Sequence, residues 1–293
     1  MKYRITHETS YGYNEPVSLC HNEAHLILRN CDSQICTYRQ LKINPLPAIQ
    51  HERIDFFGNV VNYFSIQAPH TTLTVTATSE IQIQFSEIVS TLSASPSWEQ
   101  VSETIKNSLD PMTLEAREFI LDSPFITVDD SLKTYAQPSF TPDRPLLEAV
   151  NDLMNRIYTE FSYDPHFTTI ITPLSEVLEH QRGVCQDFAH LMIGCIRAME
   201  LPARYVSGYL ETLPPPGQEK LQGSDASHAW LSVYVPEQGW TDFDPTNNQI
   251  PTAQHITTAW GRDYSDVTPL KGIIFGGGEH TLTVSVDVKR IES

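Results

Sequence analysis

Alternating hydrophobic and polar residues dominate the first 90 positions of the chain. The stretch Leu73–Phe85 reads LTVTATSEIQIQF, the pattern of a half-buried strand. The turn dipeptide Gly58-Asn59 lies between two apolar segments, which is a hairpin signal. Several short strands separated by turn residues predict a β-rich, β-sandwich-like N-terminal domain over residues 1–90.

The hydrophobic period changes to that of a helix after residue 90. Trp98, Val101 and Ile105 recur at helical spacing. A stronger apolar face follows Pro145, a residue favoured at the first position of a helix. We therefore expect residues 91–160 to form a helical connecting segment.

The last third of the chain mixes helix and strand patterns. A helix is expected from Cys185 to Met199, where Leu201-Pro202 stops it. Strands are expected at residues 203–210, 227–235, 240–244 and 280–291. A helix followed by antiparallel strands predicts an α+β core over residues 161–293.

Composition and charge exclude several classes of partner. The 293 residues are 40% hydrophobic, which is enough apolar material for packed cores. The formal net charge is −17, and the cations are scattered along the chain. Such a surface repels phosphate backbones and anionic lipids, so we expect neither nucleic acid nor a membrane surface as a partner.

The compartment is predicted from the cysteines and from the start of the chain. No apolar run approaches the roughly 20 residues of a membrane helix, and the N-terminus MKYRITHETSYGYN has no secretory apolar region. Five cysteines, an odd number, do not make a disulfide scaffold. We expect a cytoplasmic protein with free thiols, and no oligomeric state is predicted.

One cysteine differs from the others in its position. Cys185 begins the expected helix directly after Gly183-Val184, whereas Cys195 shares the apolar stripe of that helix. A helix N-terminus carries partial positive charge and free N–H groups, which stabilise a thiolate and an oxyanion beside the sulfur. Cys185 is therefore the candidate nucleophile.

A thiolate nucleophile needs an imidazole base, and the imidazole needs an orienting acceptor. His228 lies early in one expected strand, and Asp244 ends the next. If Val235 pairs with Gly239 around a three-residue turn, Asp244 lies diagonal to His228 on the same face of the sheet. A one-residue slip would reverse this placement, and Asp242 shares the strand face with Asp244 as the alternative acceptor.

Segments around these residues closely resemble the core of bacterial transglutaminase-like proteins, and they occur in the same order. The segments are RGVCQDFAH at 182–190, PARYVSGY at 202–209, SHAW at 227–230, GW at 239–240 and FDPTN at 243–247. The sequence GRDYSDV at 261–267 resembles a segment near the end of that core. The first 90 residues resemble the β-rich region that accompanies the core, at YGY (11–13), PV (16–17) and DFFGN (55–59).

The resemblance implies a papain-like α+β core with a Cys-His-Asp triad. In that triad Cys185 is the nucleophile, His228 the base and Asp244, rather than Asp242, the acceptor. It also implies acyl transfer or hydrolysis at amide bonds, an activity of a family that includes cysteine proteases. The chain lacks the upstream tryptophan that animal transglutaminases use as an oxyanion donor, and Tyr163 is the candidate substitute.

No cofactor site is predicted. Cys20, His21, His25, Cys31 and Cys36 form a loose group among strand-like residues, without the tight loops of a zinc site. A calcium-loop pattern is absent from the sequence. We therefore expect neither a metal nor an organic cofactor.

The function expected from these residues is cysteine-dependent acyl transfer through a thioester on a peptide or protein substrate. Water is the expected acceptor, which makes the protein a protease or amidase. The alternatives are a transglutaminase with an amine acceptor and a catalytically silent peptide-binding protein of the same fold. The loop Leu213–Asp225 leads into the strand of His228, where it could admit or shield an extended peptide or be an inert insertion.

Overall fold

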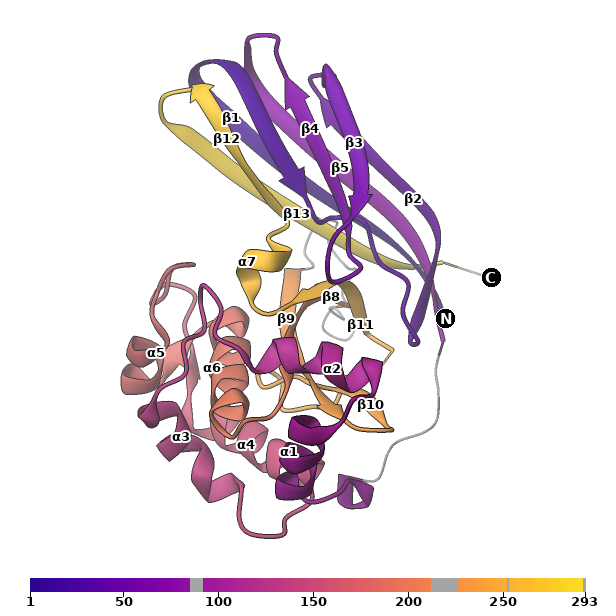
Figure 1. The fold of residues 1–293 in the computed structure, drawn as a ribbon. Coiled ribbons are helices and arrows are strands. Elements are labelled where there is room, and N and C mark those ends of the chain that lie inside the picture. Colours follow the sequence, from indigo (N-terminus) through magenta and orange to yellow (C-terminus); the bar gives the residue numbers. More distant parts are fainter. Residues whose placement is uncertain (85–91, 212–225, 252, 292–293) are drawn as a thin grey trace, which may run out of the picture.

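The computed structural model describes residues 1–84, 92–211, 226–251 and 253–291. Figure 1 shows three layers: the N-terminal sheet, a second and smaller sheet, and a group of helices on the far side of the second sheet. The fold is therefore α+β, as predicted. The loop Leu213–Asp225 lies outside the described residues.

The first layer is an antiparallel sheet built around one long strand. β1 runs for 23 residues, from Lys2 to Ala24. Its first half pairs with β5 (His70–Ile83), and its second half pairs with β4 (Val60–Ile66). β2 (Gln34–Asn44) and β3 (Ile49–Ile54) extend the sheet on either side. The β-rich N-terminal region predicted from the alternation is confirmed.

Two C-terminal strands complete this sheet. β13 (His280–Ile291) pairs with the first half of β1, and β12 (Leu270–Gly276) pairs with its second half. The sequence groups these residues with the core region 161–293, whereas their backbone partners lie in the N-terminal sheet (Figure 1). The alternation correctly predicts a strand at 280–291. It does not predict which strand pairs with it, because alternation only determines which face of a strand is buried.

The helices before residue 200 share one hydrophobic core. Buried residues such as Leu132 and Val150 pack in the same cluster as Leu191. None of the helices within the described ranges is long and apolar enough to cross a membrane. The longer helices are α1 (Trp98–Asn107), α2 (Pro111–Arg117), α3 (Asp130–Ala136), α4 (Leu146–Glu160), α5 (Leu174–His180) and α6 (Cys185–Ala198). Short elements are η1 (Leu92–Ala94), η2 (Glu118–Ile120), η3 (Gln137–Ser139) and α7 (Tyr264–Val267).

The second sheet is antiparallel, with the strand order β10-β9-β8-β11. Its strands are β8 (Ala203–Leu210), β9 (Ala226–Val235), β10 (Gly239–Phe243) and β11 (His255–Gly261). On β9, Leu231 and Val233 lie in the core cluster that contains α6. Because side chains alternate along a strand, His228, Trp230 and Ser232 point to the opposite face.

Trp230 requires a glycine on the neighbouring strand. Gly208 of β8 pairs with His228 of β9. A Cβ atom at Gly208 would lie 2.5 Å from the Trp230 ring and would overlap the carbonyl oxygen of Ile256. The absence of a side chain at this position therefore lets the fully buried indole lie across β8.

The N-terminal sheet contacts the edge strand β11 through two buried amide side chains. Gln34 accepts a hydrogen bond from the N–H of Thr257 at 2.9 Å and donates to the carbonyl of Thr257 at 2.6 Å. Asn59, from the predicted hairpin turn, makes the same pair of bonds with Trp260 at 3.0 and 2.8 Å. These bonds fix the N-terminal region against the β11 edge of the second sheet.

Candidate active site

Cys185 is the first residue of α6, as predicted, and its side chain is half-buried. The carboxylate of Asp187 accepts hydrogen bonds from the N–H of Val184 at 2.7 Å and from the hydroxyl of Thr168 at 2.6 Å. A Cβ atom on Gly183 would lie 2.7 Å from that carboxylate, so glycine is needed at this position. Asp187, a residue of α6, thus caps the N-terminus of the helix that begins at Cys185.

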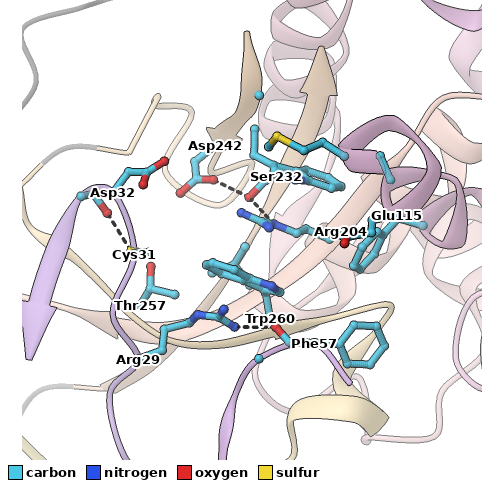
Figure 2. A pocket seen from close by; sticks show the side chains of 18 of the residues that line it. Arg29, Cys31, Asp32, Phe57, Glu115, Arg204, Ser232, Asp242, Thr257 and Trp260 are labelled. Atoms are coloured by element: carbon cyan, nitrogen blue, oxygen red, sulfur yellow. Dashed lines mark hydrogen bonds between the residues drawn. The ribbon is translucent and has the colours of Figure 1, made fainter. Parts of the chain in front are cut away.

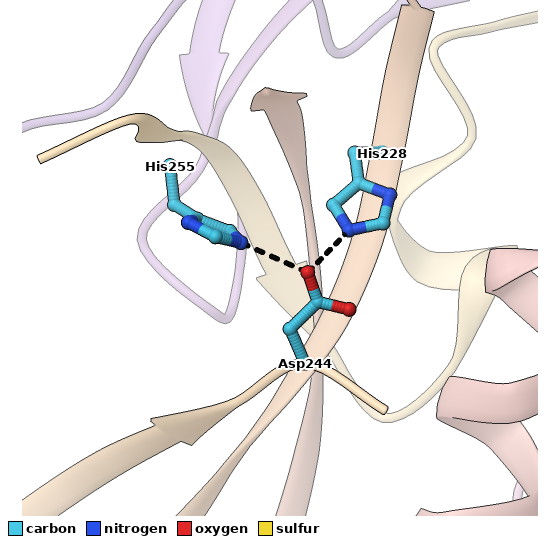
Figure 3. Close-up of side chains that lie close together, drawn as sticks. All are labelled: His228, Asp244 and His255. Carbon is cyan, nitrogen blue, oxygen red and sulfur yellow. Dashed lines mark hydrogen bonds and ion pairs between the residues drawn. The ribbon is translucent and has the colours of Figure 1, made fainter. Parts of the chain in front are cut away.

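His228 and Asp244 lie in direct contact (Figure 3). Nε2 of His228 is 2.7 Å from Oδ2 of Asp244, and both residues are buried. The contact depends on the register of β9 and β10, in which Val235 pairs with Gly239, the register assumed from the sequence. Asp244 follows β10 directly and forms a bridge with Gln249, which holds its backbone in place.

The electrostatics of this pair favour a protonated imidazole. Burial alone lowers the pKa of His228, but hydrogen bonds with Asp244 and Cys185 outweigh burial and raise it to about 10. Burial raises the pKa of Asp244, but hydrogen bonds from His228 and His255 outweigh it and hold that pKa well below its usual range. Since Nε2 faces Asp244, Nδ1 is the ring nitrogen that remains for the thiol of Cys185.

Asp242, the alternative acceptor, has a different set of contacts. Its Oδ2 accepts a hydrogen bond from the indole N–H of Trp230 at 3.1 Å, and its Oδ1 accepts one from the hydroxyl of Ser232. The ring of Trp230 in turn lies beside His228, with 6.0 Å between the ring centroids. Asp242 therefore orients Trp230, while Asp244 contacts the histidine.

The sequence reasoning missed a second histidine, His255, which binds the same carboxylate oxygen (Figure 3). Its Nε2 lies 3.0 Å from Oδ2 of Asp244, and its ring packs edge-on against Trp230. His255 is on β11, two strands away from β9, so no local sequence pattern relates the two histidines.

Asn247 was also missed as a site residue, although it lies in the quoted segment FDPTN. Its side-chain amide donates to Oδ2 of Asp244 at 2.7 Å, and its backbone N–H and that of Thr246 donate to Oδ1 at 3.3 and 3.0 Å. Aspartate side chains often bind backbone groups two or three residues ahead in the sequence, so this turn could have been predicted from the sequence.

Tyr163 lies near the thiol. β6 (Ser162–Tyr163) pairs in parallel with β7 (Arg182–Gly183), and Tyr163 is opposite Gly183. Burial raises the pKa of the Tyr163 hydroxyl, and the nearby groups of Cys185 and Asp187 raise it further. The parallel pairing thus brings this candidate oxyanion donor into the surroundings of Cys185.

The described residues contain one tight cluster of groups of the kinds that ligate metals: His228, Asp244 and His255, with ligand atoms within 4.8 Å of one another. Both histidines direct Nε2 at the same carboxylate oxygen, so these atoms already take part in the hydrogen bonds of the site. All five cysteines are free, and Cys20 is buried in the core of the N-terminal sheet.

Two sequence families match the chain. Residues 3–82 match the bacterial transglutaminase-like N-terminal region, and residues 133–245 match the transglutaminase-like superfamily. The second match includes Cys185, His228 and Asp244. The first match ends with β5, so β12 and β13 lie outside both matched ranges.

Relatives match over the full length or over the core alone. An uncharacterized protein of Mycobacterium tuberculosis is 43% identical over 296 residues, which cover 99% of this chain and 93% of the relative. A protein-glutamine gamma-glutamyltransferase of Pseudomonas aeruginosa is 31% identical over 107 residues, 34% of this chain and 16% of its own length. A crystal structure described as a putative cysteine protease from Cytophaga hutchinsonii has a TM-score of 0.77 at 23% identity, and it covers all of this chain and 91% of its own. At that identity the likeness shows the shared fold.

Proposed function

The chain belongs to the transglutaminase-like superfamily, and on that premise we propose that it transfers acyl groups from peptide or carboxamide bonds through a thioester on Cys185. The sulfur of Cys185 attacks the carbonyl carbon, and His228 gives a proton to the leaving amine. An acceptor then attacks the thioester, with His228 taking its proton, which releases the acyl group and restores the thiol. The observation that carries the proposal is His228 between Asp244 and Cys185.

The surroundings of His228 support its role as acid and base. The carboxylate of Asp244 is fully buried and bound by several donors, so it can hold Nε2 in one orientation without exchanging with solvent. The raised pKa of His228 favours an imidazolium beside a thiolate, which is the charge distribution of an activated cysteine. In this role Asp244 orients the imidazole and stabilises its positive charge.

The tetrahedral intermediate carries a negative oxygen that needs donors. We assign this role to free N–H groups at the start of α6 and to the hydroxyl of Tyr163. The helix terminus supports the first assignment, and the pairing of Tyr163 with Gly183 supports the second.

Water is the proposed acceptor, which makes the protein a protease or amidase that acts on a peptide or protein substrate. The sequence has no calcium-loop pattern and lacks the upstream tryptophan of the animal crosslinking enzymes. A transglutaminase with an amine acceptor is the alternative. Five free cysteines support a cytoplasmic location, where thiols stay reduced.

The nucleophile can be tested by limited alkylation of the intact protein with iodoacetamide at pH 6, followed by peptide mapping. We expect Cys185 to react first, because it combines a helix N-terminus with a neighbouring imidazole. Burial raises the pKa of the other thiols at Cys20, Cys36 and Cys195, so these should react slowly. Cys31, which is also half-buried, is the matched control for access. First reaction at any cysteine other than Cys185 would contradict the assignment.

The acceptor can be tested by incubating the protein with glutamine-containing peptides and a labelled primary amine, with mass spectrometry of both products. Cleaved peptides or new carboxylates that disappear in Cys185→Ala would support hydrolysis. Amine incorporation that outruns hydrolysis would establish the transglutaminase alternative. The absence of both products, together with an unreactive Cys185, would favour the catalytically silent peptide-binding reading.

A further inference from the structure

A cavity of about 710 Å³ lies between the loops that follow β1 and β3, the α2–η2 segment and the second sheet (Figure 2). Its walls come from distant parts of the chain: Arg29 and Phe57 follow β1 and β3, Phe119 lies in η2, and Arg204 and Trp260 lie on β8 and β11. Its volume is in the range of pockets that bind small molecules.

This cavity is separate from the candidate active site. Cys185, His228 and Asp244 do not line it. Ser232, which does line it, is four residues beyond His228 on β9, or about 13 Å along the strand. The two places share one face of the sheet, with Trp230 between them.

Two arginines stack on the same indole within the cavity wall. The guanidinium carbon of Arg29 lies 3.0 Å from the ring centroid of Trp260, and that of Arg204 lies 3.7 Å from it. Figure 2 shows the two arginines on opposite sides of the ring. The guanidinium carbon of Arg204 also lies 4.2 Å from the ring centroid of Trp240. Arg204 thus contacts two indoles, and it shares one of them with Arg29.

Among the described residues, neither cation forms an ion pair with a carboxylate, and Arg204 is linked to Asp242 only through the hydroxyl of Ser232. Arg29 donates to the carbonyl of Phe57 at 3.1 Å and to Asn59 at 2.5 Å, and its Nε has no hydrogen-bond partner among the residues that the structure describes. Arg204 donates from Nε to the hydroxyl of Ser232 at 3.3 Å. Both arginines are more than nine-tenths buried, and within the described part of the chain neither forms an ion pair.

This arrangement leaves positive charge in a poorly solvated place. Burial lowers the pKa of Arg29 to about 10 and that of Arg204 to about 9, although Asp55 and Asp242 act in the other direction. Stacking on an indole compensates for part of the lost hydration of a guanidinium, but a buried charge without a counter-charge remains costly. An anion bound in the cavity would supply that counter-charge.

The acidic residues of the cavity limit the kind of anion. Both carboxylate oxygens of Asp242 already accept hydrogen bonds, from Trp230 and Ser232. Asp32 and Glu115 are exposed at the rim of the cavity. Acidic residues at the rim repel ligands with several negative charges. A ligand with a single negative charge is repelled less and can enter the cavity.

We propose that this cavity is a binding site for a small ligand with a single carboxylate group and an apolar body. The carboxylate lies at the guanidinium groups of Arg29 and Arg204, because a planar guanidinium fork matches the geometry of a carboxylate. The apolar body lies against the rings of Phe57, Phe119 and Trp240, which line the same cavity.

Intrinsic tryptophan fluorescence of the full chain can test this proposal, because Trp240 and Trp260 line the cavity. The probes are N-acetylglycine and N-acetylphenylalanine, each compared with its neutral amide at constant ionic strength. We expect saturable binding of both acids, tighter for the phenylalanine derivative, and at least about 10-fold weaker binding of the amides. No saturable binding of either acid at millimolar concentration, or equal binding of acid and amide, would overturn the proposal.

Variants of the two cavity arginines test whether the acids bind in this cavity. Arg204→Gln is expected to weaken binding of the acids at least about 10-fold, whereas Arg53→Gln, an exposed arginine paired with Glu23, is the matched control and should bind like the wild type. If Arg204→Gln does not fold, Arg29→Lys provides the test, since it keeps the charge but loses the fork and the stacking. Unchanged binding in the folded variant would place the ligand elsewhere and overturn the proposal.

Two further comparisons separate this site from other readings. Cys185→Ala should bind the acids like the wild type, so this proposal stands or falls independently of the proposed acyl transfer. Inorganic phosphate tests the ligand class. Binding of phosphate more tightly than of either carboxylate would contradict the assignment of a carboxylate ligand.

Discussion

The two ends of one sheet face hold buried charge in opposite ways. At one end, Asp244 accepts hydrogen bonds from two imidazoles, a side-chain amide and two backbone N–H groups. At the other end, Arg29 and Arg204 lie against indoles, and no carboxylate of the described residues is within ion-pair distance of either. Trp230 joins the two ends, since it contacts His228 with its ring and Asp242 with its N–H.

The difference shows two ways in which the fold stabilises a buried charge. One charge is fully bound by the protein's own groups, and the other keeps donors that a ligand can use. A carboxylate with every lone pair bound is fixed in position and ionisation state, which suits an orienting role. A stacked guanidinium is fixed in position but keeps donors for a further partner. Mutations and pH can test each half of this contrast.

The largest effect is expected from replacing Asp244, the carboxylate that contacts His228. Asp244→Asn should lower kcat/KM by up to about 10⁴-fold, because loss of the orienting carboxylate has that effect in a serine triad. Asp242→Asn should lower it far less, because Asp242 contacts Trp230 and Ser232. Steady-state kinetics of both variants, with circular dichroism as a folding control, would decide. The opposite ranking would make Asp242 the acceptor.

The link between the two ends can be broken at Gly208. Gly208→Ala places a Cβ atom against the Trp230 ring and a carbonyl oxygen, so it should destabilise the protein by about 3 kcal/mol. Gly12→Ala is the matched control in another strand, where the Cβ would meet only the hydroxyl of Thr281 at 3.0 Å. Urea unfolding measures both, and equal losses of stability would show that Trp230 does not depend on Gly208.

A smaller effect is expected from replacing His255, the second histidine that binds Asp244. His255→Phe removes one donor from Asp244, and turnover should fall about tenfold, which corresponds to one hydrogen bond to a charged group. His255→Gln, which keeps an N–H donor, should recover part of the loss. Activity between pH 5 and 9 gives the second readout, because a positioning role predicts a shifted profile as well as a lower maximum. An unchanged profile in His255→Phe would assign this residue to packing alone.

A further test follows stability as the pH changes. The pKa of His228 is about 10 in the folded protein against 6.5 ordinarily, so the folded state holds the proton more tightly. The stability that this provides is complete below pH 6.5 and is lost as the pH rises through 10, at up to about 1.4 kcal/mol per pH unit. Urea unfolding of the wild type and of His228→Gln from pH 6 to 9 should show their difference shrinking as the pH rises. A constant difference would contradict the raised pKa.

Local patterns were sufficient for the elements that carry the proposed triad. The helix expected at Cys185–Met199 ends one residue earlier, and the strand expected at 203–210 has those bounds. The register of Val235 with Gly239, which the sequence left as an assumption, is the one present, and it brings Asp244 to His228. These features depend on residues close together in sequence, which is why they could be predicted.

Features that depend on distant segments could not be predicted in this way. His255 reaches Asp244 from β11, where a bulge between Thr257 and Ala259 interrupts the alternation of faces. Trp260, beyond that bulge, contacts Arg29 from the segment between β1 and β2. A periodic pattern states which side chains share a face, but it does not state which remote segment covers that face.

The amide side chains of Gln34 and Asn59 have a consequence for the solubility of the second sheet. They occupy hydrogen-bonding positions along β11 that a neighbouring strand would otherwise take, and β11 is the edge of its sheet. An exposed strand edge is a template for pairing with other chains. The N-terminal sheet thus shields this edge against aggregation with two side chains in place of a strand, and a fragment that lacks it would expose β11 to self-association.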